Sequence, residues 1–290
     1  MKILLFGRSG QVAREIQRLA GPELEIQALG RDAADLTDPQ ACARQIAESR
    51  CEAVINAAAY TAVDRAEEEE ALATRINGEA PGAMAQACAG RDLPFLHIST
   101  DYVFDGESAR AWREDDPTAP LNAYGRSKLA GERAVAAAGG QHVILRTAWV
   151  YAAEGSNFPR TMLRVGAQRD RLSVVGDQRG APTPAADIAA SLLRIACAYR
   201  DGQGESGIFH YCGKPATTWY GFAKTIFEQA PWIETPELVA IRSSAWPTPA
   251  KRPGNSVLDC SKIARAYGIT QPDWRDGLPA LLTAIKEETA

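Results

Sequence analysis

The first residues of the chain combine a buried strand, a glycine turn and the start of a helix. Lys2–Phe6 is a short apolar run followed by Gly7, which is typical of a strand buried in a parallel sheet. A helical pattern then runs to Leu19. Gly7 permits a tight turn, Gly10 lets the backbone approach a pyrophosphate, and Ala13 is small enough for close helix–strand packing. This order predicts a dinucleotide-binding opening of an α/β fold, against the alternative of an ordinary β-turn-α connection.

Strands and helices alternate with short connections as far as residue 150. Further strands are expected at residues 24–29, 52–57, 93–98 and 142–146, with helices starting near residues 39, 77 and 122. This alternation predicts a Rossmann-type, doubly wound parallel sheet. Beyond residue 150 the pattern loosens, and tryptophan and proline become frequent after residue 218. We therefore expect a dinucleotide-binding domain at residues 1–150, joined by a helix near residues 186–199, and a smaller substrate lobe in residues 151–290.

Composition excludes several classes of function. The net charge of −4 argues against general nucleic-acid binding, and no apolar run approaches the roughly 20 residues that span a bilayer. The chain enters a strand at once, so no signal peptide is expected. The six cysteines are scattered without a CxxC pair, which indicates free thiols in a reducing cytoplasm. The three histidines lie in apolar, strand-like runs and are interpreted as core or edge residues, not as metal ligands.

A tyrosine and a lysine four residues apart, Tyr124 and Lys128, share one face of an expected helix. A nearby ammonium favours the phenolate, so Lys128 is expected to lower the pKa of Tyr124 and to help it pass a proton to a developing alkoxide. Thr100 ends the preceding strand and is expected to hold the same oxygen. Next to a hydride donor, these groups suit the reduction of a ketone. Tyr220 and Lys224 repeat the spacing, but no strand ending in hydroxyl residues leads into them, so we interpret them as a structural pair.

Charged residues near the second strand indicate which dinucleotide is bound. This strand ends at residues 30–32, Gly-Arg-Asp, where a site that prefers NAD usually has an acid at the strand end. Arg31, together with Arg8, is expected to meet a 2′-phosphate, which favours NADPH over NADH. Solvent exposure is the alternative interpretation of both arginines. Asp35 and Leu36 would then lie near the adenine.

Seven segments carry a resemblance to a known family. They are residues 3–12, 56–64, 99–104, 120–125, 146–151, 177–183 and 246–253, and they run in order over nearly the whole chain. The later segments, around Trp149, Asp177 and Arg252, are the most specific. Together they resemble the extended short-chain dehydrogenase/reductases, and within these the dTDP-4-dehydrorhamnose reductase family.

The resemblance implies an activity and a set of site residues. The implied reaction is the NADPH-dependent reduction of the C4 ketone of dTDP-4-dehydro-β-L-rhamnose, which supplies L-rhamnose for cell-surface polysaccharides such as lipopolysaccharide. Tyr124 is then the proton donor, and Lys128 holds the nicotinamide ribose and tunes Tyr124. Thr100 takes the hydroxyl position. Cofactor-contacting positions are Gly10, Gln11, Val12, Asp35, Leu36, Ala59, Tyr60 and Thr61, and substrate-contacting positions are Thr100, Asp101 and Trp149.

Further expectations concern the diphosphate and the assembly. Lys251 and Arg252 are expected to hold the substrate diphosphate, with ordinary surface charge as the alternative. Some relatives form a dimer bridged by magnesium through glutamates. Glu15 is present here, but Asp187 stands close to where a second glutamate is expected, so no metal ligand is assigned. A monomer and a homodimer both stay open.

Two alternative functions remain open at this point. One is another sugar-nucleotide enzyme on the same fold, a reductase, an epimerase or a dehydratase. A dehydratase usually needs an Asp-Glu pair beside the threonine, whereas Thr100 is followed here by Asp101 and Tyr102. The other is a non-catalytic NADP-binding regulatory subunit.

Overall fold

The computed structural model describes residues 1–289 and is built around one parallel sheet of six strands. The strands lie in the order β10-β5-β4-β3-β1-β2. Their bounds are β1 (Lys2–Phe6), β2 (Glu25–Leu29), β3 (Ala53–Asn56), β4 (Phe95–Thr100), β5 (His142–Thr147) and β10 (Gly207–His210). The direction of winding reverses between β1 and β3, which is the crevice where open α/β sheets bind ligands. The predicted Rossmann-type fold is confirmed.

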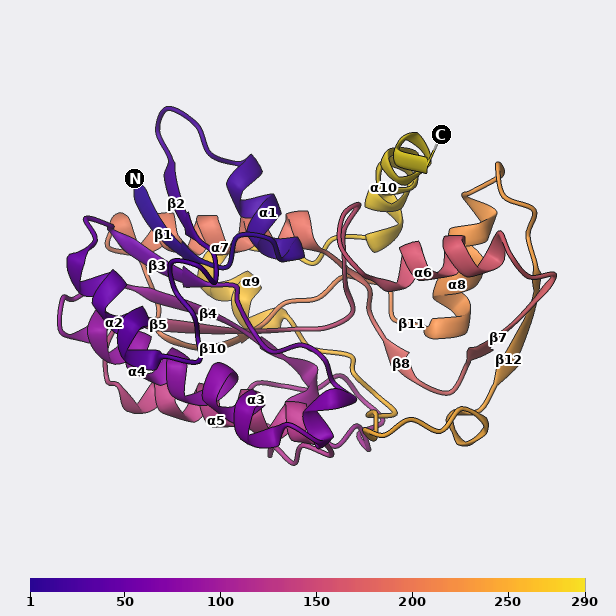
Figure 1. Ribbon diagram of the computed structural model, residues 1–290, viewed down its shortest axis with the longest axis horizontal. Helices are drawn as coiled ribbons and strands as arrows, with labels where there is room; N and C mark the ends of the chain where they lie inside the picture. The colour runs from indigo at the N-terminus through magenta and orange to yellow at the C-terminus, as the bar shows by residue number, and fades with distance from the viewer. Residues whose placement is uncertain (290) are drawn as a thin grey trace.

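Helices cover both faces of the sheet (Figure 1). One face packs against α1 (Gln11–Arg18), α7 (Ala185–Arg200) and α9 (Ser261–Tyr267), and the other against α2 (Pro39–Glu48), α4 (Ala80–Ala89) and α5 (Ala123–Ala137). Ile3 and Leu5 belong to the first core, Leu4 and Phe6 to the second. Because successive side chains of a strand point to opposite faces, a strand covered on both sides reads as an unbroken apolar run.

A smaller lobe lies beyond the carboxyl ends of the strands, on the right of Figure 1. It contains α6 (Phe158–Gly166), α8 (Trp219–Glu228), α10 (Trp274–Thr289) and three two-stranded sheets. These sheets pair β6 (Val150–Tyr151) with β9 (Thr183–Pro184), β7 (Arg171–Val175) with β12 (Glu237–Ile241), and β8 (Arg179–Gly180) with β11 (Thr217–Thr218). The second half of the chain also returns to the main sheet through α7, β10 and α9. The division into domains at residue 150 stays a prediction.

Side-chain caps fix the helix starts that the sequence predicts. Asp38 accepts a hydrogen bond from the Ala41 N–H at 2.9 Å at the start of α2, and Asn122 accepts one from the Gly125 N–H at 2.8 Å at the start of α5. The helix expected near residue 77 begins earlier, because α3 (Glu70–Thr74) continues through a π-helical turn, η2 (Arg75–Glu79), into α4.

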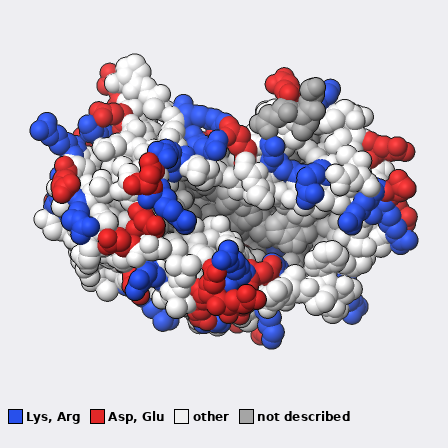
Figure 2. Space-filling model, viewed as in Figure 1, with Lys and Arg blue, Asp and Glu red and all other residues white. Residues whose placement is uncertain are grey.

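Three short 3₁₀ segments complete the described chain: η1 (Arg65–Glu67), η3 (Asp101–Val103) and η4 (Ser243–Ala245). Within the described range, no helix is both long enough and apolar enough to cross a membrane. All six cysteines are unpaired. Figure 2 shows the molecule hollowed between the sheet and the smaller lobe.

Candidate active site

The turn between β1 and α1 has the geometry of an anion-binding site. Gly7 has a φ of 102°, and a Cβ atom there would lie 3.2 Å from the Ala58 nitrogen. Gly10 is the N-cap residue of α1 and offers no side-chain cap, so the first N–H groups of this helix keep their capacity for a ligand. Gln11 accepts a hydrogen bond from Asn157 at 3.0 Å, and Val12 is buried in the core. These residues fit the pyrophosphate of a dinucleotide, with Val12 contributing its backbone.

The loop after β3 is fastened by a residue that the sequence analysis did not single out, Asn77. The Tyr60 N–H donates to Asn77 Oδ1 at 2.8 Å, and Asn77 Nδ2 donates to the Tyr60 carbonyl at 3.0 Å and to Ser127 Oγ at 2.9 Å. The side chains of Ala59 and Thr61 are exposed beside this clamp. Asn77 is one of several polar residues in the alanine-rich stretch 71–89, so nothing in the sequence sets it apart for this role.

At the end of β2, the two arginines that were expected to act together, Arg8 and Arg31, have different partners. Arg8 forms an ion pair with Asp32 at 3.0 Å, and both side chains are exposed. Arg31 is also exposed and lies close enough to Asp35 to contribute to the lowering of its pKa, of which the hydrogen bond from the Thr37 N–H is the largest cause. Leu36 is buried in the core. The charge of Arg8 is therefore partly neutralised by Asp32. Arg31, by contrast, forms no ion pair among residues 1–289.

The expected tyrosine and threonine lie together at the carboxyl edge of the sheet. Thr100 is the last residue of β4, and its hydroxyl lies close enough to that of Tyr124, in the first turn of α5, to act on the tyrosine pKa. Thr100 also donates to Asp101 Oδ1 at 3.0 Å and accepts from the Tyr102 N–H at 3.2 Å. A Cβ atom on Gly125 would lie 2.2 Å from the Tyr102 carbonyl oxygen, so a glycine is needed for α5 to approach the segment that follows β4 this closely.

The pKa of Tyr124 moves in the direction opposite to the expectation. Burial raises the pKa of Tyr124, the charge of Asp101 adds to the rise, and the nearby Thr100 hydroxyl acts against it. The expected lowering by Lys128 is wrong here, because Lys128 Nζ donates to the Ile98 carbonyl at 2.7 Å and contacts His97 Nε2 at 3.2 Å. A raised pKa keeps Tyr124 a neutral phenol, which is the form that donates a proton.

Two buried polar atoms near Tyr124 have no hydrogen-bond partner within residues 1–289. They are Asp101 Oδ2 and Thr147 Oγ1. Thr147 pairs in register with Thr100 across β4 and β5, so both atoms belong to the carboxyl edge of the sheet. Burial raises the pKa of Asp101 to about 6, against the hydroxyls of Ser256 and Thr100. Since buried polar atoms without partners are costly, these two fit a ligand that carries hydroxyl groups.

Trp149 and Arg252 come from the smaller lobe and from the segment beside it. Trp149 has a φ of 48°, a strained value for a bulky residue, and its ring stacks on Trp219 with centroids 3.5 Å apart. Arg252 forms a bidentate pair with Asp64 at 2.8 and 2.9 Å, whereas Lys251 is exposed. The charge of Arg252 is thus partly used in holding the loop after β3.

The second Tyr–Lys pair has the character of a helix surface. Lys224 is exposed and lies 3.8 Å from Glu228, one turn further along α8. Tyr220 is partly buried and packs against the small apolar cluster around Phe227. The structural interpretation of this pair agrees with its surroundings.

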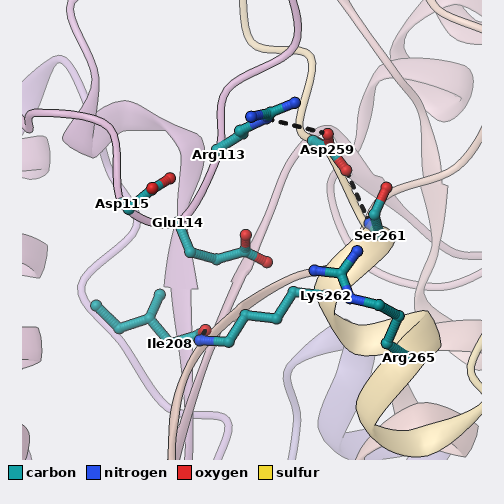
Figure 3. Close-up of a pocket in the computed structure, with 8 residues that line it drawn as sticks. All are labelled: Arg113, Glu114, Asp115, Ile208, Asp259, Ser261, Lys262 and Arg265. Atoms are coloured by element: carbon teal, nitrogen blue, oxygen red, sulfur yellow. Dashed lines mark hydrogen bonds and ion pairs between the residues drawn. The ribbon is translucent and has the colours of Figure 1, made fainter.

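A cavity of about 600 Å³ lies away from all these groups (Figure 3). Several of its polar side chains already have partners within the protein. Lys262 donates to the Ile208 carbonyl at 2.7 Å, Glu114 accepts from the His210 N–H at 3.0 Å, and Arg113 lies 3.6 Å from Asp259. The cavity borders the outer edge of β10, and none of the predicted site residues lines it.

In the described part of the chain, no group of three or more His, Cys, Asp or Glu residues is arranged to hold a metal ion. Glu15 pairs with Arg18 on its own helix. Asp187 is half-buried, and burial raises its pKa.

Comparison with known proteins gives one consistent result. The family described as "RmlD substrate binding domain" matches residues 1–287. The dTDP-4-dehydrorhamnose reductase of Burkholderia thailandensis is 45% identical, covering 95% of this chain and 96% of its own. That of Escherichia coli K12 is 40% identical over 100% of both chains.

Solved structures agree with the sequence comparison. A dTDP-4-dehydrorhamnose reductase from Clostridium acetobutylicum superposes with a TM-score of 0.91 at 36% identity, covering 99% of this chain and 100% of its own. One from Bacillus anthracis, in complex with NADP, gives 0.90 at 32% identity over 97% and 98%. A UDP-glucose 4-epimerase from Thermotoga maritima reaches 0.80 at only 19% identity, which shows a shared fold alone.

Proposed function

This chain belongs to the dTDP-4-dehydrorhamnose reductase family of NADP-dependent oxidoreductases, and from that membership we propose which of its residues carry the reaction. The reaction reduces the C4 ketone of dTDP-4-dehydro-β-L-rhamnose and gives dTDP-β-L-rhamnose. The residues proposed to act on the reacting oxygen are Tyr124 and Thr100. Lys128 is proposed to hold the ribose of the cofactor.

The hydroxyl pair of Tyr124 and Thr100 is the single observation that carries this proposal. Bound NADPH supplies the hydride that reaches C4. As negative charge grows on O4, Tyr124 donates its proton to that oxygen and Thr100 holds it by a hydrogen bond. The raised pKa of Tyr124 supports this direction of transfer, because the phenol stays protonated until the substrate oxygen becomes basic.

The remaining predicted residues are proposed to bind the two ligands. Gly7, Gly10, Gln11 and Val12 take the pyrophosphate, and the Ala59–Thr61 loop with Asp35 and Leu36 takes the rest of the cofactor. Asp101 and Trp149 face the sugar, with Arg252 toward the diphosphate. Asp101 Oδ2 and Thr147 Oγ1 supply unpartnered polar atoms for sugar hydroxyls. No metal is assigned, and the six unpaired thiols support a cytoplasmic location.

The direct test replaces Tyr124 by phenylalanine. We expect Tyr124→Phe to lower turnover roughly 100- to 10,000-fold, the usual contribution of a general acid, while the affinity for NADPH stays close to that of the parent protein. Turnover is followed by the loss of NADPH absorbance, with the keto-sugar made in place by the upstream enzymes. NADPH affinity is followed by fluorescence titration.

The chain supplies its own control in the second Tyr–Lys pair. Tyr220→Phe removes a phenol with the same helical spacing and is expected to leave turnover unchanged. Near-normal turnover of Tyr124→Phe would show that Tyr124 is not the proton donor. A parent protein that oxidises no NADPH in the coupled assay would favour a regulatory subunit over an enzyme.

Preference for NADPH over NADH is proposed to depend on Arg31. Arg31→Ala should raise the Michaelis constant for NADPH about tenfold, because a charge-assisted hydrogen bond to the 2′-phosphate is lost, and should change that for NADH little. Arg44→Ala on α2 is the control, since Arg44 is exposed and lies 3.7 Å from Asp38. Equal losses with both cofactors would contradict the assignment.

A further inference from the structure

A line of buried hydrogen-bonding groups lies behind Lys128. Lys128 Nζ is 3.2 Å from His97 Nε2, His97 Nδ1 is 3.1 Å from Asn56 Nδ2, and the Ala58 N–H donates to Asn56 Oδ1 at 3.1 Å. Lys128 is 1% exposed, and Asn56 and His97 are fully buried. This line runs from the loop after β3, across β4, to α5, and no step of the reaction described above uses it.

The direction of these hydrogen bonds is fixed at one end. A backbone N–H can only donate, so the Asn56 side chain must present its oxygen to Ala58 and its NH₂ group to His97. His97 Nδ1 then accepts. Burial is the largest cause that lowers the pKa of His97 well below its usual value, so the ring is neutral and carries its single proton on Nε2. An N–H donor therefore faces the amino group of Lys128.

A donor at this position favours one protonation state of Lys128. An ammonium has three donors and no acceptor, so its contact with the His97 Nε2–H satisfies neither group. A neutral amine accepts that hydrogen bond and still donates to the Ile98 carbonyl. His210 shows the opposite arrangement, because its Nδ1 faces the Trp112 carbonyl at 3.0 Å and its Nε2 is left to accept from Arg146 at 3.4 Å.

We propose that Asn56 and His97 are positioning residues that act through Lys128, presenting an N–H to its amino group and so favouring the neutral amine over the ammonium. The effect on catalysis rests on the proposed role of Lys128. Burial independently lowers the pKa of Lys128 to about 8, and Glu132 on the same helix opposes that shift. Glu132 is itself held by Arg146 of β5 and Ser99 of β4. Tyr124, Tyr102 and Asp101 are further titratable groups at this end of the site.

The tautomer of His97 tests the proposal without reference to activity. The chain has only three histidines, so the ¹⁵N spectrum of histidine-labelled protein is simple to assign, with His97→Gln identifying the His97 signals. We expect His97 to carry its proton on Nε2. His142 and His210 should carry theirs on Nδ1, because these atoms face the carbonyls of Gly140 at 2.8 Å and Trp112 at 3.0 Å. A proton on Nδ1 of His97 would overturn the proposal.

Two variants replace the hydrogen-bond donor that faces Lys128 by an acceptor. In Asn56→Asp both carboxylate oxygens accept, so His97 should move its proton to Nδ1 and turn a lone pair to Lys128. His97→Gln offers an amide oxygen at the Nε2 position and adds no charge, which separates hydrogen-bond direction from electrostatic attraction. In both variants the pKa of Lys128, followed by ¹³C NMR of labelled lysine, should rise by about one unit or more.

The kinetic readout is the alkaline limb of the kcat/KM profile against pH. We expect this limb to move upward with the pKa of Lys128 in both variants, a change that a purely structural role would not produce. An unchanged Lys128 pKa in folded His97→Gln would overturn the proposal. A raised pKa with an unmoved limb would support the hydrogen-bond effect and contradict the proposed part of Lys128 in the reaction.

Discussion

At the scale of single residues, Asp101 is a buried carboxyl group whose ionised form destabilises the folded protein. Burial raises its pKa from 3.8 to about 6, so between these values the native protein keeps a proton that the unfolded chain releases. Stability from this group is therefore present below about pH 4 and is lost as the pH rises through 6. Asp101→Asn should remove this dependence and make the protein more stable above pH 6, by up to about 3 kcal/mol, while lowering activity.

The measurement is urea unfolding at a series of pH values between 2 and 8. Asp116→Asn is a control of opposite sign, because Arg110 lowers the pKa of Asp116 to about 2, and the stabilisation is lost as the pH falls. Parallel stability curves for Asp101→Asn and the parent protein would contradict the argument.

The residue scale also shows what spacing in the sequence can predict. The i to i+4 relation placed Tyr124 and Lys128 on consecutive turns, and the strand end placed Thr100 beside Tyr124. The direction of the Tyr124 pKa shift could not be read in this way, because it depends on burial and on the Asp101 charge. Asn77 and His97 were missed as site residues since their partners lie on other elements.

At the scale of elements, α5 reaches the site because glycines remove side chains from its contact with the preceding helical segment. A Cβ atom on Gly131 would lie 2.0 Å from the carbonyl oxygen of Asn77, and one on Gly82 would lie 2.9 Å from the Cβ of Ala134. Since Asn77 also fastens the Tyr60 loop, this contact joins the packing of α5 to the shape of the cofactor site.

Gly131→Ala should therefore destabilise the protein by about 1–3 kcal/mol, although the same change in an open helix stabilises by roughly 1 kcal/mol. NADPH affinity should fall as well, because Asn77 is displaced. Gly90→Ala is the control: it meets only ordinary contacts, 3.6 Å or more away. Thermal unfolding and NADPH titration measure both effects, and equal melting temperatures for the two variants would refute the packing argument.

Element starts with a side-chain cap were predictable, as Asp38 and Asn122 show. The π-helical turn at residues 75–79 was not, because Asn77 within it is held by the Tyr60 loop and by Ser127 of α5, contacts that local propensity does not show. The two-residue strands of the smaller lobe also escape prediction. Each depends on a partner more than 30 residues away in the chain, as in the pairing of Val150 with Thr183.

At the scale of the whole molecule, Arg252 ties the segment near the smaller lobe to the sheet. Its guanidinium meets Asp64 after β3 and also donates to Thr248 Oγ1 at 2.6 Å and to the Ala250 carbonyl at 2.9 Å. Arg252→Ala should raise the Michaelis constant for the sugar nucleotide roughly ten- to hundredfold, the effect of losing a hydrogen bond to a charged group, with little change for NADPH.

Arg164→Ala is the matched control, since Arg164 is an exposed cation of the smaller lobe on α6. Steady-state kinetics with each substrate varied in turn separates the two constants. Equal increases for NADPH and the sugar nucleotide would show that Arg252 supports the fold as a whole and not the diphosphate.

The outer border of β10 has a consequence for how copies of the protein meet. A strand at the end of a sheet normally offers its amide and carbonyl groups as a template for a foreign strand. Here Lys262 occupies the Ile208 oxygen and Glu114 occupies the His210 nitrogen. Two of the ladder groups along this margin are therefore unavailable to another copy of the protein, and the side chains that occupy them also line the cavity beside it, so they hinder fibril-like stacking.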